Sequence, residues 1–379
     1  MDGTRASEGY GVPGEDDRLR VALSMLTLVP GAMGGSETYA RALTRELAGS
    51  TTIDAHAFVP RIARGFSEGV PEVVIEEITG GPSTRDRLTT VATAIARAGR
   101  IRHRMGRMDV LHVPFTVPVP PAPAGVPLVQ TLLDVQHLEL PEMFSRAELA
   151  YRSYYYDRTA RRADAVITIS EAAKRQIVSR LGADPERVHV AHLGVDTERF
   201  TPQTGPRDDV VFYPARGWPH KNHARLVEAV ALLREQRPSL RLVLTGGGLE
   251  TLGPLPEWVE VRGLVPADEL VSLYATAGCL AFPSLFEGFG LPPLEAMASG
   301  CPVAASTAGS IPEVCGDAAI LFDPTDVRDM ASAIDRALAA PPALVSAGLE
   351  RVQAFTWASC AAAHERVYRS VAAARPRRA

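Results

Sequence analysis

The sequence predicts an α/β protein built from two Rossmann-like domains in tandem, which face each other across a central cleft. Three observations lead to this prediction. A strand, a glycine-rich turn and a helix open the chain, a linker-like stretch follows at 200–209, and a second series of alternating strands and helices comes after it. Such alternation favours parallel sheets covered by helices. A chain of 379 residues is also too long for one ordinary core.

The first series begins with an apolar run at 19–28, which we interpret as a strand. The loop PGAMGGSE follows it and leads into a helix at 38–48. Ser170 is expected to cap a helix at 171–181, because its hydroxyl can accept from a free amide of the first turn. Further strands are expected at 53–59, 73–78, 110–113, 128–131, 165–169 and 188–191.

The second series begins after the stretch FTPQTGPRDD at 200–209, whose Pro, Gly and Asp residues are typical of a linker. Strands are expected at 210–213, 240–245, 259–262, 279–282, 303–306 and 319–322. Helices are expected at 223–236, 267–277, 292–299, 326–339 and 357–373. The domains would then span 18–200 and 205–355, with a disordered polar tail at 1–17 and a short basic tail at 374–379.

Composition excludes several classes of protein. The net charge of -4 does not indicate the basic surface that nucleic-acid binding requires. The four cysteines, at 279, 301, 315 and 360, have no metal-binding spacing and are expected to be reduced and buried. No apolar run approaches the roughly 20 residues of a membrane span, and the start lacks the pattern of a signal peptide. We therefore expect a cytoplasmic protein. No G-x-G-x-x-G follows the first strand, which disfavours hydride transfer.

The segment PSLFEGFGLPPLEAMASG at 283–300 is the strongest candidate for ligand binding. It follows an expected strand and opens a helix, and Gly288 and Gly290 allow its backbone to approach a ligand closely. The amides of Phe289 and Leu291 would lie at the positive end of that helix, where phosphates or sugar hydroxyls bind.

Two carboxylates accompany this loop. Glu287 lies within it and Glu295 one turn into the helix, so both can face one ligand. The alternative is an ordinary strand-to-helix turn with two solvated glutamates.

The segment FYPARGWPHKN at 212–222 carries Arg216 and Lys221 directly after another expected strand. Two cations at the carboxyl end of a strand suit a diphosphate leaving group. Because the sequence contains no metal-binding cluster, we expect no metal and no cofactor, and these side chains would neutralise the charge. The alternative is a pair of ordinary surface cations.

Together these segments resemble the retaining glycosyltransferases of family 4, which have the two-domain GT-B fold. The resemblance runs from about residue 20 to 369. Its most specific part is the Glu-x7-Glu spacing of Glu287 and Glu295, followed by the pair Arg216 and Lys221. Supporting matches are GGSE at 34–37, DVQHLELPEMF at 134–144, LVLTGGG at 242–248, RGLVPADELVSLYATA at 262–277 and SIPEVCGDAAILFDP at 310–324.

The resemblance implies a hexosyltransferase that takes a sugar from a nucleotide-sugar donor. Glu295 would bind the donor ribose and Glu287 the transferring sugar near its C3 hydroxyl. Arg216 and Lys221 would bind the diphosphate, and the backbone amides of Gly288, Phe289, Gly290 and Leu291 would bind sugar and phosphate. Gly35 would offer its amide across the cleft, Gly246 would belong to the donor site, and the base would lie near Gly263 to Val265. The helix at 357–373 would cross back to the first domain.

One departure from the family pattern concerns the donor sugar. The family commonly has His-Asp where this chain has Leu133 and Asp134, and that His lies by the C6 hydroxyl and the reacting carbon. Asp134 keeps its place among the expected catalytic residues. His137 either reaches the same place or is a surface or supporting histidine. A leucine favours a 6-deoxy sugar, since it cannot pair with a buried hydroxyl.

Two features of the first half have open interpretations. The segment 86–107 is read as one helix with Leu88, Val91, Ile95 and Ala98 on one face and arginines crowded into its second half. It would either touch an anionic lipid surface or charged acceptor, which would place the enzyme at the inner face of the membrane, or be a solvated face. The tyrosines at 151, 154, 155 and 156 would either line an acceptor cleft or pack under a helix.

Two other functions remain open beside transfer to an acceptor: a nucleotide-sugar epimerase with the same architecture, and a non-catalytic nucleotide-sugar sensor. The sequence does not identify the acceptor, for which a natural product, a polysaccharide end and a lipid-linked sugar all stay open. It does not indicate an oligomeric state either.

Overall fold

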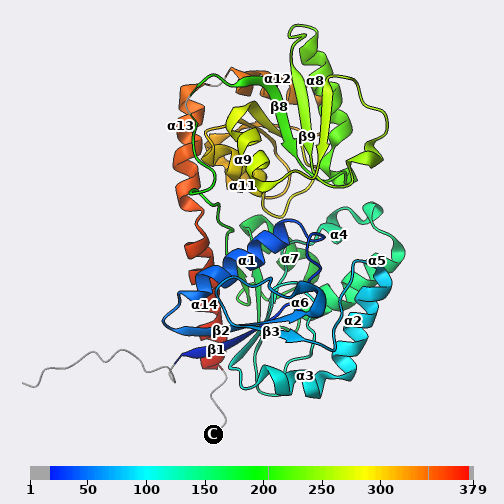
Figure 1. The fold of residues 1–379 in the computed structure, drawn as a ribbon, viewed down its shortest axis with the longest axis vertical. Helices are drawn as coiled ribbons and strands as arrows, with labels where there is room; N and C mark the ends of the chain where they lie inside the picture. The colour runs from blue at the N-terminus through cyan, green and yellow to red at the C-terminus, as the bar shows by residue number, and fades with distance from the viewer. Residues whose placement is uncertain (1–17, 204, 340, 375–379) are drawn as a thin grey trace, which may run out of the picture.

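The computed structural model describes residues 18–203, 205–339 and 341–374. The expected tails at 1–17 and, apart from Ala374, at 374–379 lie outside the described residues. Two parallel sheets, each with helices around it, lie one above the other in Figure 1. The prediction of an α/β protein with two Rossmann-like domains is therefore confirmed.

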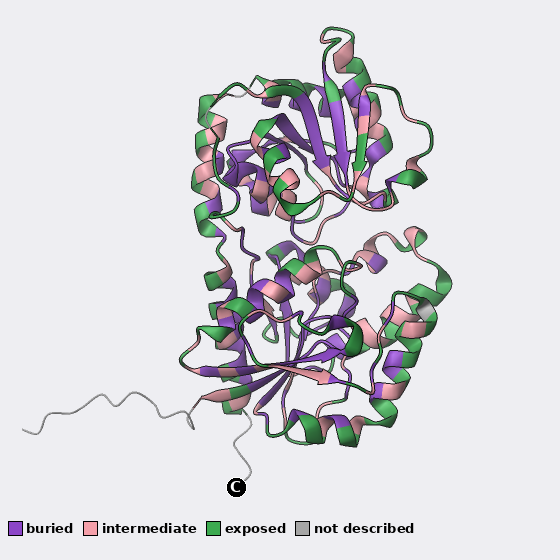
Figure 2. Ribbon diagram, viewed as in Figure 1, coloured by how far each residue is buried: buried purple, intermediate pink, exposed green. Residues whose placement is uncertain are grey.

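The first sheet has the order β3-β2-β1-β4-β5-β6-β7, and each pair of neighbouring strands is parallel. Two of its inner strands, β4 and β6, are buried along their whole length, and the other inner strands are mostly buried, as expected for a parallel sheet covered on both faces (Figure 2). Its strands are β1 Leu19–Ser24, β2 Ile53–Pro60, β3 Glu72–Ile75, β4 Val110–Val113, β5 Leu128–Thr131, β6 Ala165–Thr168 and β7 Val188–Val190.

The helices of the first domain lie between these strands in the chain. They are α1 Gly35–Ala48, α2 Thr84–Ala96, α3 Ala98–Met105, α4 Gln136–Glu139, α5 Arg146–Arg152, α6 Arg158–Ala160 and α7 Glu171–Leu181, with short helical turns η1 Arg61–Ala63, η2 Pro141–Met143 and η3 Ser153–Asp157. The turn η3 is π-helical and joins α5 to α6. The expected cap is present, because the Ser170 hydroxyl accepts from the amide of Ala173 at 3.0 Å.

The second sheet has the order β10-β9-β8-β11-β12-β13, again with parallel neighbours. Its strands are β8 Asp208–Pro214, β9 Arg241–Thr245, β10 Val259–Gly263, β11 Ala277–Phe282, β12 Val303–Ser306 and β13 Ile320–Phe322. Its helices are η4 Pro219–Lys221, α8 His223–Arg234, η5 Leu249–Leu252, α9 Ala267–Thr276, α10 Leu291–Ala298, α11 Ile311–Cys315, η6 Gly316–Ala318, α12 Val327–Leu338, α13 Pro342–Arg351 and η7 Val352–Ala354.

The final helix, α14 Trp357–Ala374, belongs in space to the first domain. It runs down one side of the molecule and packs against α1, β4 and β6 (Figure 1). A buried polar network fixes it there: the Tyr39 hydroxyl lies 2.7 Å from Nε2 of His364, and the Tyr368 hydroxyl 2.7 Å from Nδ1 of His112. The expected crossing-back of the terminal helix is confirmed.

Several expected elements differ from the observed ones. The first strand ends at Ser24, although the apolar run continues to 28. Met25, Leu26 and Leu28 are buried, but they lie beyond the end of the strand. The strand expected at 73–78 ends at Ile75, where a turn bonds the amide of Ile78 back to its carbonyl at 2.9 Å. Helices α4, α5, α6, α11 and α13 were not expected.

The single helix expected at 86–107 is wrong. The structure has two helices that meet at Arg97, and the buried residues of the first include Val91 and Ala94, while Leu88 and Ile95 are exposed. The apolar positions therefore do not share one buried face. A glycine shortly after the junction, Gly99, is a weak helix former, which is consistent with a break there.

Candidate active site

The second sheet places a cation and a carboxylate side by side. β8 and β11 are parallel neighbours, so the loops that follow them leave the same edge of the sheet. Lys221 comes after β8 and Glu287 after β11. The Nζ atom of Lys221 lies 2.5 Å from Oε1 of Glu287, and their side chains are only 15% and 13% exposed. Two of the expected site residues thus form a largely buried ion pair.

Backbone contacts on two sides hold Lys221 in place. Asn222 has a φ of 61°, in the left-handed region that asparagine tolerates. Its side-chain amide donates to the carbonyls of Pro283 at 3.0 Å and Pro324 at 2.8 Å. The Tyr213 hydroxyl donates to the carbonyl of Lys221 at 3.0 Å. These hydrogen bonds fix the backbone of Lys221, so its ammonium group projects from a defined position, as a preorganised charge requires.

The glycine-rich loop after β11 reaches the first domain. Gly290 has a φ of 114°, and α10 begins at the next residue. A Cβ atom on Gly288 would lie 3.1 Å from Cβ of Asp134 and 3.2 Å from the carbonyl oxygen of Leu133. Such contacts are tighter than ordinary side-chain packing, so a glycine at 288 lets the loop meet the segment where the sequence departs from the family pattern.

Glu295 points one carboxylate oxygen at Tyr274. The Tyr274 hydroxyl donates to Oε2 of Glu295 at 2.6 Å. Burial raises the pKa of the Glu295 carboxyl, and the hydrogen bond from Tyr274 opposes that change. Among the described residues, none makes a hydrogen bond with its other oxygen, Oε1, although the charge of Arg199 also acts on this carboxylate. That oxygen is available to accept from a ligand.

The first domain contributes the loop before α1. A Cβ atom on Gly35 would lie 3.8 Å from Cδ1 of Leu291, and the guanidinium of Arg216 donates to the carbonyl of Gly31 at 2.9 Å. The carboxylate of Glu37 accepts from the amide of Gly31 at 3.0 Å and so fixes this loop. Arg216 and Gly35, which are far apart in sequence, are therefore brought to one interface between the domains.

The remaining glycines of the expected donor site lie at the ends of β9 and β10. The amide of Gly246 donates to the carbonyl of Gly263 at 2.7 Å. A Cβ atom on Gly246 would lie 2.4 Å from the carbonyl oxygen of Ala215, so only glycine fits there. Gly263 has a φ of 63°, and Val265 follows it, partly buried. The loops after β8, β9 and β10 are thus packed together at the same edge.

Asp134 and His137 lie on the first domain, but they face different surroundings. Asp134 accepts from the amide of Gln136 at 2.9 Å and lies beside the glycine-rich loop. His137 is only 1% exposed, and its Nε2 atom lies 2.9 Å from Oδ1 of Asp157. The edge of the Tyr156 ring packs against it. A surface position for His137 is therefore wrong: it pairs with a carboxylate of the π-helical turn inside the domain.

The tyrosine cluster divides between the two expected roles. Tyr151, Tyr155 and Tyr156 pack against the core beneath α2, whereas Tyr154 is exposed. The guanidinium of Arg158 lies 5.4 Å from the centre of the Tyr154 ring. Tyr154 is thus the most exposed of the four tyrosines, and the other three are partly buried.

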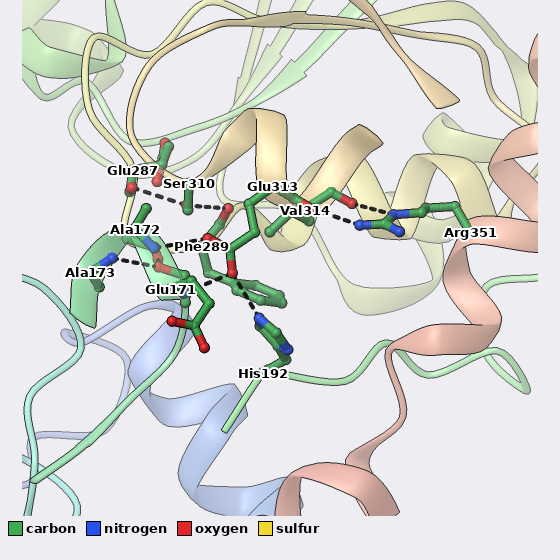
Figure 3. A network of polar contacts seen from close by, with 12 residues as sticks. Glu171, Ala172, Ala173, His192, Glu287, Phe289, Ser310, Glu313, Val314 and Arg351 are labelled. Atoms are coloured by element: carbon green, nitrogen blue, oxygen red, sulfur yellow. Dashed lines mark hydrogen bonds and ion pairs between the residues drawn. The ribbon is translucent and has the colours of Figure 1, made fainter. Parts of the chain in front are cut away.

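A polar network around Glu313 lies at the interface between the domains, and no sequence pattern predicted it (Figure 3). Glu313 of α11 accepts from Nε2 of His192 at 2.8 Å and from two backbone amides of the first domain. Burial by itself raises the pKa of Glu313, but the hydrogen bonds from His192 and the two amides outweigh it, so that the pKa is lowered. The motif at 310–324 contained this glutamate, but an acid in a short helix has no signal that predicts a contact with another domain.

Within the described residues, no cluster of three or more His, Cys, Asp or Glu side chains is arranged to bind a metal ion. No helix in the described part of the chain is long and apolar enough to cross a membrane.

Two parallel Rossmann-like sheets, with the Lys221–Glu287 ion pair at the edge of the second and the loop before α1 of the first domain beside Arg216, have the architecture of a GT-B glycosyltransferase. Family models agree: "Glycosyl transferases group 1" matches residues 195–348, and "Glycosyltransferase Family 4" matches residues 33–199. The chain belongs to glycosyltransferase family 4. It is an enzyme of the hexosyltransferase class.

Two curated relatives illustrate the similarity. The MMP alpha-(1->4)-mannosyltransferase of Mycolicibacterium hassiacum is 36% identical over 229 residues, which cover 56% of this chain and 55% of that protein. The chain thus aligns with little more than half the length of that relative. The D-inositol 3-phosphate glycosyltransferase of Mycobacterium sp. (strain KMS) is 30% identical over 327 residues, which cover 76% of this chain and 73% of that protein.

Two solved structures share the fold. A sucrose-phosphate synthase from Thermosynechococcus elongatus superposes with a TM-score of 0.77 at 22% identity, over 94% of this chain and all of that chain. Anabaena HepE, solved in complex with UDP-glucose, superposes with a TM-score of 0.69 at 19% identity, over 94% of this chain and all of that chain.

Proposed function

We propose that this enzyme transfers a hexose from a nucleoside-diphosphate sugar to an acceptor hydroxyl, and that the anomeric configuration of the sugar is retained. The observation that carries the proposal is the buried pair of Lys221 and Glu287, with Arg216 at the same edge of the second sheet and Gly35 opposite. The family also favours transfer over epimerisation or sensing.

In the proposed reaction, the bond between the anomeric carbon and the diphosphate breaks, and its electron pair leaves with the diphosphate. The acceptor oxygen bonds to the same carbon and loses its proton, which the departing diphosphate takes up. Negative charge therefore grows on the leaving diphosphate. We assign its neutralisation to Arg216 and Lys221 without a metal ion, because both cations come from the loop after β8, Lys221 beside Glu287 and Arg216 at the interface with the first domain. Lys221 would exchange part of its contact with Glu287 for a phosphate oxygen.

The other donor contacts follow from the same edge of the sheet. Glu295 would accept from the ribose hydroxyls through the oxygen that Tyr274 leaves free. Gly246, Gly263 and Val265 would border the base, and the amides from Gly288 to Leu291 would bind sugar and phosphate.

For the sugar itself, two candidates have support. Leu133 borders the glycine-rich loop through its carbonyl and is apolar, which favours a 6-deoxy donor. The Nε2 atom of His137 is engaged by Asp157, so that nitrogen does not supply the missing hydrogen bond. The second candidate is an ordinary hexose such as mannose, which the name of the mannosyltransferase relative favours.

The experiment that tests the proposal is NMR of the anomeric proton in the first-formed product. Donors are first ranked by the rise in unfolding temperature that each nucleotide sugar produces, since a ligand that binds the folded state stabilises it. The product should keep the donor's configuration. An inverted product would contradict the assigned reaction, and turnover of donor without any acceptor product would favour the alternatives.

A further inference from the structure

Glu313 lies in the second domain, but its carboxylate contacts the first. It accepts from the backbone amides of Glu171 and Ala172, both at 2.8 Å, and from the ring of His192 at 2.8 Å (Figure 3). The two amides belong to the first turn of α7. Amides at that position have no partner within the helix, and the helix dipole favours a negative charge there. We call Glu313 and these three partners the Glu313 clasp.

The cap of α7 is thus shared between the domains. Ser170, on the first domain, accepts from the amide of Ala173 at 3.0 Å. Its hydroxyl also donates across the interface to the carbonyl of Gly288 at 2.9 Å. The first turn of α7 is satisfied completely only when the second domain contributes Glu313. Separation of the domains would leave two amides to water and a carboxylate without its partners.

The segment that carries Glu313 also supports the glycine-rich loop from behind. The Ser310 hydroxyl lies 2.7 Å from the carbonyl oxygen of Phe289 and 3.1 Å from that of Glu287. A Cβ atom on Gly309 would lie 2.4 Å from the carbonyl oxygen of Glu287, so the two segments are in direct backbone contact. A displacement of the segment 309–313 would therefore displace the backbone of Glu287.

The chain passes between the two domains twice, near Val195 and near Phe355, and we call these segments the first and the second crossing. The Glu313 clasp contacts them through His192. The amide of Val195, on the first crossing, donates to the carbonyl of Phe355, on the second, at 3.0 Å. The ring of His192 packs against Phe355 at 5.7 Å between centroids, and Phe289 packs against Phe355 at 5.8 Å. His192, the side-chain partner of Glu313, thus lies where the two crossings contact the glycine-rich loop.

The backbone of α11 is anchored on its own domain. The guanidinium of Arg351 donates to the carbonyl of Glu313 at 2.6 Å and to that of Val314 at 2.9 Å. The carboxylate of Glu313 is therefore the part of this residue that links the domains, and its substitution can be made without removing the anchor.

We propose that Glu313 is a positioning residue: its carboxylate joins the segment 309–313, which supports the glycine-rich loop, to the first domain, so it is needed for turnover and not for binding of the nucleoside diphosphate alone. The claim about turnover rests on the function proposed above. The claim about the domain contact does not, because it concerns two amides whose exposure to water is measurable without any substrate.

The test compares Glu313→Gln with Glu365→Gln in the full chain. The two glutamate side chains are equally exposed, at 21%, but Glu365 accepts from Thr52 and Arg369 within the first domain and α14. In Glu313→Gln, the amides of Glu171 and Ala172 should exchange with deuterium about 10-fold faster or more, because a hydrogen bond to a charged group is lost. In Glu365→Gln they should exchange as in the wild type.

Turnover gives the second measurement. Glu313→Gln should lower kcat by about 10-fold or more, while the Kd for UDP or GDP, whichever stabilises the wild type more, should change by less than about twofold. Glu313→Asp, which keeps the charge one methylene shorter, should fall between the wild type and the glutamine variant. It also replaces the glutamine variant if that one does not fold.

The outcomes separate the two proposals. Unchanged exchange at Glu171 and Ala172 in Glu313→Gln overturns the domain contact, whatever the enzyme's substrate. Faster exchange with unchanged kcat overturns the positioning role. A loss confined to the Kd of the nucleoside diphosphate would make Glu313 part of the donor site and also overturn it. A wild type that transfers no sugar would refute the proposed function and leave the exchange result to decide the contact.

Discussion

Replacement of Glu295 by glutamine should weaken the binding of the nucleoside diphosphate selectively through its ribose. One oxygen of Glu295 already accepts from the Tyr274 hydroxyl at 2.6 Å. In the glutamine variant, the single carbonyl oxygen would take that hydrogen bond, and the amide NH2 would face the ribose. The ribose hydroxyls would then lose a charged acceptor.

The size of the effect follows from this exchange. A hydrogen bond to a charged group contributes about 1.5–3 kcal/mol, so the dissociation constant should rise roughly 10- to 150-fold. The fold should not be weakened. Burial raises the pKa of Glu295, so its stabilising contribution is present at low pH and is lost as the pH rises through the folded-state value. An uncharged glutamine avoids that loss at neutral pH, and the unfolding temperature without ligand should stay the same or rise.

Calorimetry with a nucleoside diphosphate and its 2′,3′-dideoxy analogue tests the argument. The wild type should bind the ribonucleotide more tightly than the dideoxy analogue, and Glu295→Gln should bind both about equally. Glu350→Gln, a change at an exposed position of α13, is the control and should bind as the wild type does. Equal affinity of wild type and Glu295→Gln for the ribonucleotide would remove Glu295 from the ribose. Equal losses for both nucleotides would place its effect elsewhere.

Three further predictions follow from other parts of the structure. Arg216→Ala should lower kcat/KM by roughly 100-fold, or about 3 kcal/mol, because it removes a preorganised charge at the diphosphate; near-normal steady-state turnover would reject that role. Leu133→His should shift the preference between paired donors that differ only at C6 by about 10- to 100-fold towards the hydroxylated sugar, and competition assays that show no shift would discard the 6-deoxy argument. Burial lowers the pKa of His364 to about 4, below its ordinary value of 6.5. The unfolded chain therefore binds the proton first, and the free energy of unfolding should fall as the pH drops from about 6.5 to 4, by up to about 3 kcal/mol from this group at about 1.4 kcal/mol per pKa unit. Urea unfolding at pH 7 and pH 5 measures this, and a His364→Asn variant with the same pH dependence as the wild type would contradict it.

The residues of the second domain were predictable because their signals are local. Each signal lies within a segment of about ten residues: a glycine that needs a positive φ, a proline in a first helical turn, or a cation after an apolar strand. Gly290, Lys221 and Glu295 come from such segments. The strands of both sheets were likewise predictable from short apolar runs, with errors mainly at their ends. Leu28, for example, is buried although the strand ends at Ser24. An apolar sequence pattern does not distinguish a buried residue in a strand from a buried residue in a loop.

His137 shows where local signals end. Its neighbours in sequence do not indicate whether it faces the cleft, because its partner, Asp157, comes from a π-helical turn that no pattern predicted. The same holds for Glu313, whose partners lie about 120 to 140 residues earlier in the chain.

The sequence by itself determined the α/β class and the two Rossmann-like sheets, because both depend on short alternating segments of the chain. It also predicted Arg216, Lys221, Glu287 and Glu295 as site residues from local motifs. Tertiary structure alone decided that Lys221 pairs with Glu287, that Gly288 lies against Asp134, and that Glu313 joins the domains. Such contacts depend on how two separately folded sheets are placed, and that placement is set by many packing contacts across the interface that no single stretch of sequence contains.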